Sequence, residues 1–408
     1  MIGTARRRVL RSGSSLWATT TYGRSVPYAP LEGDATADVV VVGAGISGAL
    51  VAHELTRRGY AVVVLDRRVP CTGSTLASTA LLQFEIDVPM SVLGTRIGLT
   101  NAQRAWRRSV AAVRTLARLV ARERIRCEWS ARQSLYLAGD KYGARALRIE
   151  SDARRVAGIS GVFVDARTLG ERFAIDRTGA LLSDGCAVAN PVQLTAGLLR
   201  RGAARGAKIY SGADVQTVNA GRRGVELGLA NGCVVNAKHV VFCTGYEMLP
   251  AIPRAGHLIK STWAIATKPV ENLPAWMRST LVWEASDPYL YLRTTADGRV
   301  VAGGRDEKSE TRHRDRRALF SKATGIVKQV EELLPRTELK VSHRWAGAFG
   351  ESPTGLPIID RVVGAHNCYA LAGFGGNGIT HSVIGAEIIT AMIAGERDPD
   401  ANLFRAPR

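Results

Sequence analysis

Three glycines at a fixed spacing carry the clearest chemical signal in this sequence. They follow a run of four valines, residues 39–42, and they precede an apolar pattern with helical spacing. In such a turn the first glycine bends the chain off a strand, the second leaves the backbone open to a pyrophosphate, and the third lets the helix pack against the strand. The sequence therefore predicts a dinucleotide phosphate site on the backbone of Gly43, Gly45, Ile46, Ser47 and Gly48.

An acidic residue completes this unit. A second apolar run, residues 61–65, ends at Asp66, which lies 18 residues after Gly48. A carboxylate at this place can accept a hydrogen bond from a ribose hydroxyl, and Arg67 is predicted to lie beside the same nucleotide. Strand, glycines, helix, strand and acid occur in the order typical of dinucleotide binding, against the alternative of a purely structural turn.

A second glycine-rich loop, Gly-Phe-Gly-Gly-Asn-Gly at 373–378, also stands between an apolar run and a helical pattern. Only 30 residues remain after Gly378 (408 minus 378), and they hold no further strand ending in an acid, so this loop is not a second nucleotide unit. The positive pole of its helix suits the electron-rich edge of a flavin ring, with a packing turn as the alternative. The residues predicted to face the flavin are Gly375, Gly376, Asn377, Gly378, Ile379 and Thr380.

The surrounding patterns predict an α/β fold with a Rossmann-type parallel sheet and a second, β-rich part between 258 and 303. Helices are expected at 101–124, 143–156, 191–206, 312–334 and 379–393. Strands are expected at 208–210, 215–218, 225–229, 234–236, 239–243, 263–267, 289–293, 300–302 and 369–372. With one complete nucleotide unit, tandem FAD and nicotinamide domains are not expected, so the substrate itself would reduce the flavin.

Composition restricts the partners. The 55 Lys and Arg outnumber the 36 Asp and Glu, giving a net charge of +19. This excess favours a basic, solvated surface, with anionic substrates, a membrane surface or nucleic acid as alternatives. Nucleic acid is the weakest of these, because no basic stripe is interleaved with aromatic residues. No apolar run approaches the length of a membrane-spanning helix.

Cysteine usage and the chain ends bear on location. The six cysteines form no CxxC pair and stand near no histidine at metal-binding spacing, which predicts free thiols in a reducing compartment and no metal. Residues 1–35 are basic without a following apolar stretch, so we expect a frayed arm rather than a secretory signal, and residues 398–408 form a tail. We expect a cytoplasmic protein, with peripheral contact at the inner membrane face as the alternative.

Four blocks of sequence carry a family resemblance. They are residues 37–67, the loop Thr-Gly-Ser-Thr-Leu-Ala-Ser-Thr at 72–79, Val-Phe-Cys-Thr-Gly-Tyr at 241–246, and the stretch from Trp345 to Gly378. Through them the chain resembles the FAD-dependent amine and amino-acid oxidoreductases of the D-amino-acid oxidase superfamily, which includes glycine oxidase and sarcosine oxidase. Two departures leave the subfamily open: residues 73–78 read GSTLAS where many members have GASGRN, and Thr354 stands where an Asp often precedes Gly-Leu-Pro.

The resemblance implies non-covalent FAD, since no Cys or His stands at the known flavin-attachment positions. It implies a discontinuous FAD domain of residues 36–99, 186–257 and 341–397, with a substrate (cap) domain of residues 100–185 and 258–340 whose antiparallel sheet covers the flavin. Further cofactor contacts are expected at Ser74, Thr75, Ser78, Thr79, Val215, Thr244 and Gly245.

Four residues are candidates for substrate binding. Tyr291 and Arg293 share a strand face, and an Arg binds a carboxylate through paired hydrogen bonds. Arg293 also matches the carboxylate-binding Arg of glycine-oxidase-like members; the alternative is a surface salt bridge. Gln83, shortly after the loop at 72–79, is expected to face the flavin ring. His257 lies in a segment that the family places near the flavin, although a lone His is more often structural.

These residues predict oxidation of the C–N bond of a small-molecule amine or amino acid, with hydride transfer to FAD, hydrolysis of the imine, and oxygen or a quinone as electron acceptor. The alternative keeps the flavin but takes a C–O donor such as a hydroxy acid or glycerol-3-phosphate. A third reading is a flavin-dependent tRNA-modifying enzyme, which requires salt-dependent RNA binding.

Overall fold

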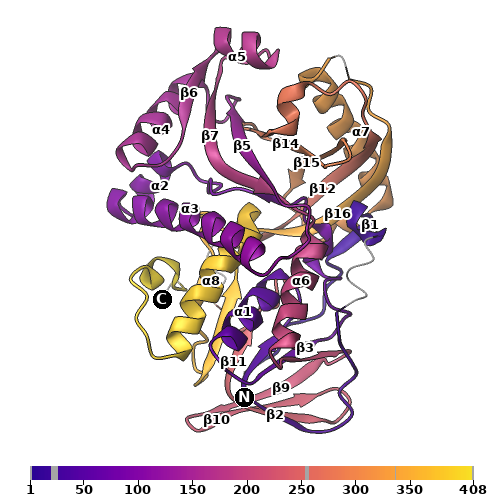
Figure 1. Ribbon diagram of the computed structural model, residues 1–408, viewed down its shortest axis with the longest axis vertical. Coiled ribbons are helices and arrows are strands. Elements are labelled where there is room, and N and C mark those ends of the chain that lie inside the picture. Colours follow the sequence, from indigo (N-terminus) through magenta and orange to yellow (C-terminus); the bar gives the residue numbers. More distant parts are fainter. Residues whose placement is uncertain (1, 20–25, 253–256, 336, 407–408) are drawn as a thin grey trace.

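The computed structural model describes residues 2–19, 26–252, 257–335 and 337–406. Two sheets lie at opposite ends of an elongated molecule, with helices packed on and between them (Figure 1). The arrangement confirms the predicted α/β class, in which a Rossmann-type sheet is joined to a largely antiparallel one.

The smaller sheet is built around β2 (Ala35–Val42), the strand that leads into the first glycine turn. Val39, Val40 and Val41 have no exposed surface, because parallel strands flank β2, helices pack on one face of it, and residues of the antiparallel β9–β10 hairpin pack on the other. The strand order is β17 (Ile358–Arg361), β18 (Cys368–Ala372), β11 (Val234–Phe242), β2, β3 (Val62–Asp66) and β8 (Lys208–Ser211). The antiparallel strands β10 (Gly224–Leu229) and β9 (Val215–Gly221) extend from β11.

Helices α1 (Ile46–Arg57), α6 (Pro191–Ala204) and α8 (Gly378–Ile393) gather on one side of this sheet (Figure 1). The predicted start of α6 is confirmed: Pro191 is its first residue, and the Asn190 side chain accepts hydrogen bonds from the two amides that follow. The long basic helix α3 (Leu99–Arg122) packs against α8.

The larger sheet contains ten strands. Their order is β1 (Arg11–Ser14), β16 (Val341–Glu351), β12 (Leu258–Pro269), β15 (Arg299–Glu307), β14 (Leu290–Thr294), β13 (Thr280–Glu284), β5 (Ser130–Leu137), β7 (Gly179–Val188) and β4 (Leu81–Leu82), with β6 (Val162–Asp165) paired to β7. Every pair is antiparallel except β13 with β5. The sheet is flanked by α2 (Met90–Ile97), α4 (Ala144–Val156), α5 (Ala166–Phe173) and α7 (Arg316–Leu333).

The structure corrects parts of the sequence interpretation. The segments 234–236 and 239–243 form one strand, β11, and β5, β7 and β16 were not predicted. Strand β16 belongs to the larger sheet, although residues 341–397 were assigned to the FAD domain. Its partner strands, β1 and β12, come from segments distant in sequence, which a local pattern does not reveal.

The N-terminal arm is not frayed where it is described. Strand β1 pairs with β16, with Gly13 opposite Trp345, and the 3-10 turn η1 (Leu16–Thr19) buries Trp17. The expected C-terminal tail also docks, since Phe404 is 1% exposed and Asp400 pairs with Arg104 on α3. Both segments therefore belong to the folded body.

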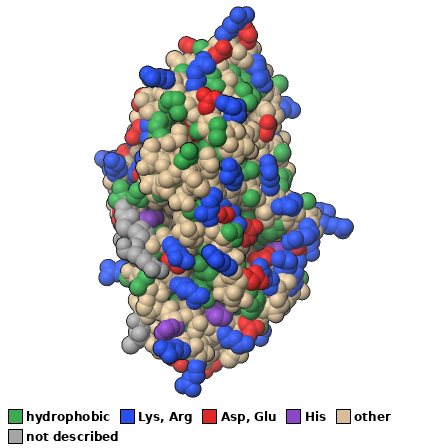
Figure 2. All heavy atoms as spheres, turned by 90° about the vertical axis from the view of Figure 1, so that its left-hand side faces the viewer, with side chains coloured by type: hydrophobic (Ala, Val, Ile, Leu, Met, Phe, Trp, Pro, Cys, Tyr) green, Lys and Arg blue, Asp and Glu red, His purple; other side chains and the backbone are tan. Residues whose placement is uncertain are grey.

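The basic side chains are spread over the height of the face shown in Figure 2, among acidic and uncharged ones. On α3, Arg108 pairs with Glu387 and Asp398, both at 2.9 Å. All six cysteines carry free thiols. None of the described helices combines the length and apolar character that crossing a bilayer requires.

Candidate active site

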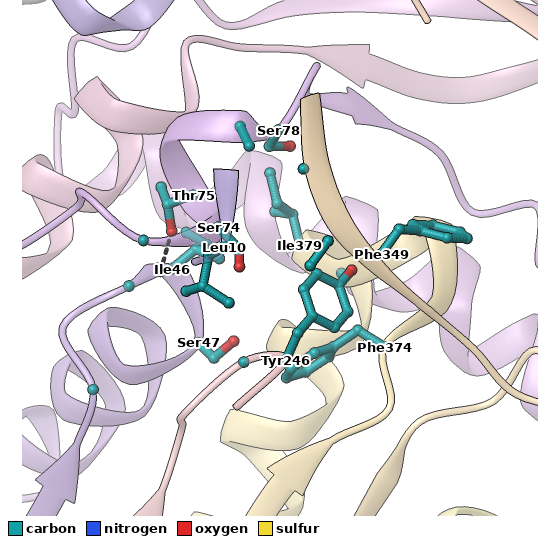
Figure 3. Close-up of a pocket in the computed structure, with 18 of the residues that line it drawn as sticks. Leu10, Ile46, Ser47, Ser74, Thr75, Ser78, Tyr246, Phe349, Phe374 and Ile379 are labelled. Atoms are coloured by element: carbon teal, nitrogen blue, oxygen red, sulfur yellow. Dashed lines mark hydrogen bonds between the residues drawn. The ribbon is translucent and has the colours of Figure 1, made fainter. Parts of the chain in front are cut away.

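One cavity lies between the two sheets and holds about 1760 Å³ of empty space, its mouth included. Its walls come from the turn after β2, the ends of β3 and β11, the 3-10 turn η3 (Ser74–Ala77), the start of α8, and strands β12, β14 and β16 of the larger sheet. Figure 3 shows Ile46, Ser47, Ser74 and Thr75 grouped on one side and Tyr246, Phe349 and Phe374 on the other.

Most of the predicted site residues line this cavity. The lining includes Gly43, Gly45, Ile46, Ser47, Asp66, Arg67, Ser74, Thr75, Ser78, Thr79, Gln83, Val215, Thr244, Gly245, Tyr291, Gly375, Gly376, Asn377, Gly378 and Ile379. Gly48, Thr380, His257 and Arg293 are not in the lining. The folding chain thus brings together residues from both glycine-rich loops, although more than 300 positions separate Gly43 from Gly375.

The three glycines of the first turn play different parts. Gly43 has φ +115°, a conformation that residues with a side chain rarely adopt. A Cβ at Gly48 would lie 1.8 Å from the carbonyl oxygen of Gly43, so Gly48 allows helix α1 to approach the strand. A Cβ at Gly45 would meet only Thr75 Oγ1, at 3.1 Å, and would project into the cavity. Gly45 is therefore the position that keeps the backbone open to a ligand.

Asp66 is held at the end of β3 by backbone donors. Its Oδ2 accepts a hydrogen bond from Ala44 N at 2.7 Å, and its Oδ1 accepts one from Arg68 N at 2.8 Å. Burial raises the pKa of Asp66, and these hydrogen bonds oppose that rise. Nearby, Arg68 donates to both carboxylate oxygens of Glu247, at 2.8 and 2.7 Å. The Arg68–Glu247 pair lines the cavity and was not predicted.

Three buried side chains fix the loop that follows η3. Trp345 Nε1 donates to the carbonyl oxygen of Ala77 at 2.8 Å, and Trp17 Nε1 donates to that of Ser78 at 2.7 Å. Arg293 Nε donates to the carbonyl oxygen of Thr79 at 2.9 Å. These donors come from β16, the N-terminal segment and β14, and none is more than 3% exposed. Three consecutive carbonyl groups are thus tied to the larger sheet and its edge.

This arrangement changes the interpretation of Arg293. Its Nη2 donates to the carbonyl oxygen of Ala189 at 3.0 Å, and its guanidinium lies over the Trp17 ring, 5.1 Å from the centroid. Burial lowers the pKa of Arg293 to about 9. The structure places Arg293 behind the loop rather than in the cavity, so the expected contact with a substrate carboxylate has no geometric support. The alternation of side chains along the strand predicted which face Arg293 lies on, but not how deeply its side chain is buried.

Of the other three candidates for substrate binding, two line the cavity and one does not. Tyr291 lines the cavity, and its hydroxyl hydrogen-bonds with Thr79 and Thr262. Gln83 also lines it, and its buried Nε2 has no hydrogen-bond partner among the described residues. His257 packs against Gly373 instead, where an added Cβ would lie 2.5 Å from His257 Nε2.

Aromatic residues surround the inner part of the cavity, which we call the aromatic chamber. The chamber is lined by Gln83, Glu85, Asp87, Tyr246, Thr262, Trp283, Tyr289, Tyr291, Phe349 and Phe374. Tyr289 and Tyr291 lie with ring centroids 5.6 Å apart, and Trp283 is stacked on Tyr136 behind it at 3.7 Å. Strands of the larger sheet thus provide an apolar wall opposite the start of α8.

The carboxyl groups of the chamber were not predicted, although the sequence holds a signal for them. Gln83, Glu85 and Asp87 line the cavity, whereas Phe84 and Ile86 between them are each 1% exposed. Such alternation places every second side chain on one face of an extended segment. Asp87 Oδ2 accepts a hydrogen bond from Gly376 N at 2.8 Å, and burial raises the pKa of Asp87.

The second glycine-rich loop is held by its own contacts. Tyr246 Oη donates to the carbonyl oxygen of Gly375 at 3.3 Å, and Thr380 Oγ1 donates to that of Gln83 at 2.7 Å. His381 Nδ1 donates to the carbonyl oxygen of Phe374 at 2.8 Å, and burial lowers the pKa of His381 to about 4. A neutral His381 therefore fixes the loop in front of α8.

Comparison with a protein-family model matches residues 38–392 of this chain to "FAD dependent oxidoreductase" (DAO). Among solved structures, glycine oxidase from Geobacillus kaustophilus superimposes with a TM-score of 0.76 at 19% sequence identity, covering 92% of this chain and 99% of that one. The likeness in fold therefore covers most of this chain.

Two curated proteins are similar along nearly the whole chain. The gamma-glutamylputrescine oxidoreductase of Escherichia coli is 23% identical, covering 97% of this chain and 92% of its own. The putative Rieske 2Fe-2S iron-sulfur protein YhfW of Bacillus subtilis is 21% identical, covering 96% of this chain and 75% of its own.

Proposed function

The chain belongs to the FAD dependent oxidoreductase family, and we propose that it oxidises the C–N bond of a small-molecule amine or amino acid. The protein is thus an FAD-dependent oxidoreductase whose donor has to be inferred. The two similar proteins glycine oxidase and gamma-glutamylputrescine oxidoreductase carry names of nitrogen compounds, which supports this choice.

The residues of the cavity suit FAD. Gly45 leaves the backbone open where a pyrophosphate would approach, and Asp66 and Val215 line the nucleotide end. The buried Ser74 Oγ has no hydrogen-bond partner among the described residues, so it is available to a phosphate oxygen. At the other end the start of α8 offers amides and a positive pole to an electron-rich ring edge. We expect the cofactor to be held without a covalent bond.

Bound FAD would accept a hydride from the carbon next to nitrogen, while the nitrogen releases a proton; the imine then hydrolyses to a carbonyl compound and ammonia or an amine, and oxygen or a quinone takes the electron pair. The chain positions the donor and limits the access of water. Trp283, Tyr289 and Phe349 provide the apolar wall that does this, and the Gln83 amide is free to bind the ligand.

The charge of the chamber is the observation that favours an amine or amino acid as the electron donor. Among the described residues that line it, the charged side chains are Glu85 and Asp87, both acidic. Glu85 is paired with the buried Arg154 at 3.4 Å, whereas Asp87 forms no ion pair with a described residue, so Asp87 supplies the unpaired negative charge of the chamber. A hydroxy acid or a glycerol phosphate needs a cation to bind its anionic group. Arg67 and Arg68 line the nucleotide end instead, and each is paired with a carboxylate, Asp214 at 3.0 Å and Glu247. A carbon–oxygen donor is therefore disfavoured.

Anaerobic titration of the purified holoenzyme tests the proposal. Amines, amino acids, hydroxy acids and glycerol phosphate are added in separate experiments, and the visible absorption band of the flavin is followed. Bleaching by a nitrogen compound, with a carbonyl product and released ammonia or amine, is the expected result. Bleaching by hydroxy acids or glycerol phosphate alone would contradict it.

A further inference from the structure

Asp87 is the residue of the chamber whose contacts say most about the substrate. It follows the alternating segment that leaves the flavin loop, and it sits against the second glycine-rich loop, where a Cβ on Gly375 would lie 2.8 Å from Asp87 Oδ2. That oxygen already accepts the amide of Gly376. The second oxygen, Oδ1, has no hydrogen bond to another described residue, and its side chain is accessible from the cavity.

The groups around Asp87 do not neutralise it. Lys260, which would favour its ionised form, forms an ion pair with Glu351, and Glu351 opposes ionisation. Lys141 also favours the ionised form, but its effect is smaller than that of Glu351. The carboxyl group of Asp87 therefore lacks a charge partner among the described residues of the cavity. A carboxylate that faces the cavity without a charge partner is available to bind a cationic group of a ligand.

The walls of the chamber suit such a cation. Tyr246, Tyr289, Trp283, Phe349 and Phe374 present aromatic rings to the cavity. Ammonium groups are attracted to the faces of aromatic rings, and a hydrocarbon chain packs against the same surface. In contrast, a carboxylate entering this chamber would meet the unpaired Asp87, and no described Lys, Arg or His lines the chamber to bind it. Glu85 beside it is already paired with the buried Arg154. Residues 253–256, which include Arg254, lie outside the described part of the chain. The experiment below therefore includes amino acids as probes, to test whether the enzyme prefers a carboxylate-bearing substrate.

We propose that the substrate is a cationic amine without a carboxylate beside the reacting carbon, and that Asp87 binds its ammonium group inside the aromatic chamber. This inference rests on the proposed C–N oxidation and narrows its substrate class. Asp87 is then a specificity-determining residue, and amino acids are poor substrates. The nitrogen that is oxidised loses its proton before hydride departs, so a diamine can keep its second ammonium on Asp87 throughout.

The test compares two matched variants of the holoenzyme, Asp87→Asn and Asp306→Asn. Asp306 is a buried carboxyl group near the same chamber, since it affects the pKa of Tyr289 and Tyr291, yet it does not line the cavity. The probes are a straight-chain diamine, a straight-chain monoamine, glycine, sarcosine and both enantiomers of alanine. KM and kcat are measured for each, and FAD content confirms that each variant is folded.

We expect the amines to be the better substrates. Asp87→Asn should raise KM for amines by at least about 10-fold and change kcat less, because a charge-assisted contact is lost. Asp306→Asn should raise KM for amines much less than Asp87→Asn does, because Asp306 does not line the cavity and cannot contact the ammonium group directly. Asp87→Glu, which keeps the charge, should recover part of the affinity, and this readout separates loss of charge from loss of structure.

Four results would overturn the inference. If amino acids reduce the flavin better than amines, or if Asp87→Asn leaves KM for amines unchanged, the substrate assignment is wrong while C–N oxidation stands. If Asp306→Asn and Asp87→Asn raise KM equally, direct pairing with Asp87 is wrong. If no nitrogen compound reduces the flavin but hydroxy acids do, the proposed function fails together with the inference.

Discussion

Arg293 Nε donates a hydrogen bond to the carbonyl oxygen of Thr79 at 2.9 Å, and this contact ties strand β14 of the larger sheet to the loop that borders the cavity. The hydroxyl of Tyr291, two residues earlier on the same strand, hydrogen-bonds with the Thr79 side chain. One strand thus holds both the backbone and the side chain of Thr79. The loop is positioned by the second sheet, so the two parts of the molecule build the cavity together.

Replacement of Arg293 by Met is expected to weaken cofactor retention rather than recognition of substrate. The substitution keeps much of the apolar volume but leaves the carbonyl groups of Thr79 and Ala189 without their donor, a loss of about 2–4 kcal/mol in the free energy of unfolding. Thermal unfolding and the dissociation constant of FAD measure the two effects. A variant with normal FAD affinity but a KM raised selectively for carboxylate-bearing substrates would restore the earlier role of Arg293.

The indole N–H of Trp17 is expected to contribute to the same retention. Trp17→Phe removes the donor to the Ser78 carbonyl while it keeps a buried ring, so FAD should dissociate several-fold faster, about 1 kcal/mol in binding. Trp276→Phe is the control, because Trp276 Nε1 donates to the Phe173 carbonyl away from the cavity. Release of flavin fluorescence on dilution measures both variants. Equal rates for the two variants would show that the N-terminal segment does not hold the loop.

A side chain at Gly45 is expected to exclude the cofactor from a folded protein. In Gly45→Val the side chain would project towards Thr75 Oγ1 and fill the space where a pyrophosphate approaches. The purified protein should be colourless with a circular dichroism spectrum like that of the wild type. Gly33→Ala serves as the control, since a Cβ there meets nothing within 4 Å. A yellow Gly45→Val protein with normal FAD content would contradict the assignment.

Amine oxidation is expected to depend on pH through Asp87. Burial raises the pKa of Asp87 above its usual value of 3.8, Glu351 reinforces the rise, and the amide of Gly376, Lys141 and Lys260 oppose it. The neighbouring Tyr246 and Tyr289 stay neutral, since burial raises their pKa values. The ionised form of Asp87 binds the ammonium group. We therefore expect kcat/KM to reach its plateau above the pKa of Asp87 and to fall as the pH drops through that pKa.

The pH profile of Asp87→Asn provides the comparison. The acid limb of kcat/KM should disappear in this variant, while kcat for bound amine changes less with pH. An identical acid limb in wild type and Asp87→Asn would mean that another group titrates.

The sequence identified most of the residues that line the end of the cavity next to the first glycine turn, because the signals for them are local. The run of valines before Gly43 and the acid at Asp66 are features of one short βαβ unit, and the structure places Gly43 and Asp66 in the cavity wall. All the residues that this pattern requires lie in one βαβ unit, so the pattern can be recognised in the sequence without knowledge of the tertiary structure.

The residues at the substrate end were predicted less completely. Which residues reach the cavity there depends on how deeply each side chain is buried and on the pairing of strands that are distant in sequence. Arg293 and Tyr291 were correctly placed on one strand face, yet only Tyr291 reaches the cavity. The docking of Trp17 depends on β1 pairing with β16, about 330 residues away, and no local pattern reveals such a register. Asp87 could have been found from the alternation with Phe84 and Ile86, which marks an extended segment with one buried face.

Rapid-mixing measurement of flavin reduction tests the central claim most directly. A straight-chain amine and its α-deuterated form are mixed anaerobically with the holoenzyme, and the decay of the flavin absorption band is recorded. The account predicts that the band bleaches, more slowly with the deuterated amine, because the C–H bond beside nitrogen breaks in that step. A band that persists with every amine and amino acid, but bleaches with a hydroxy acid, would contradict it.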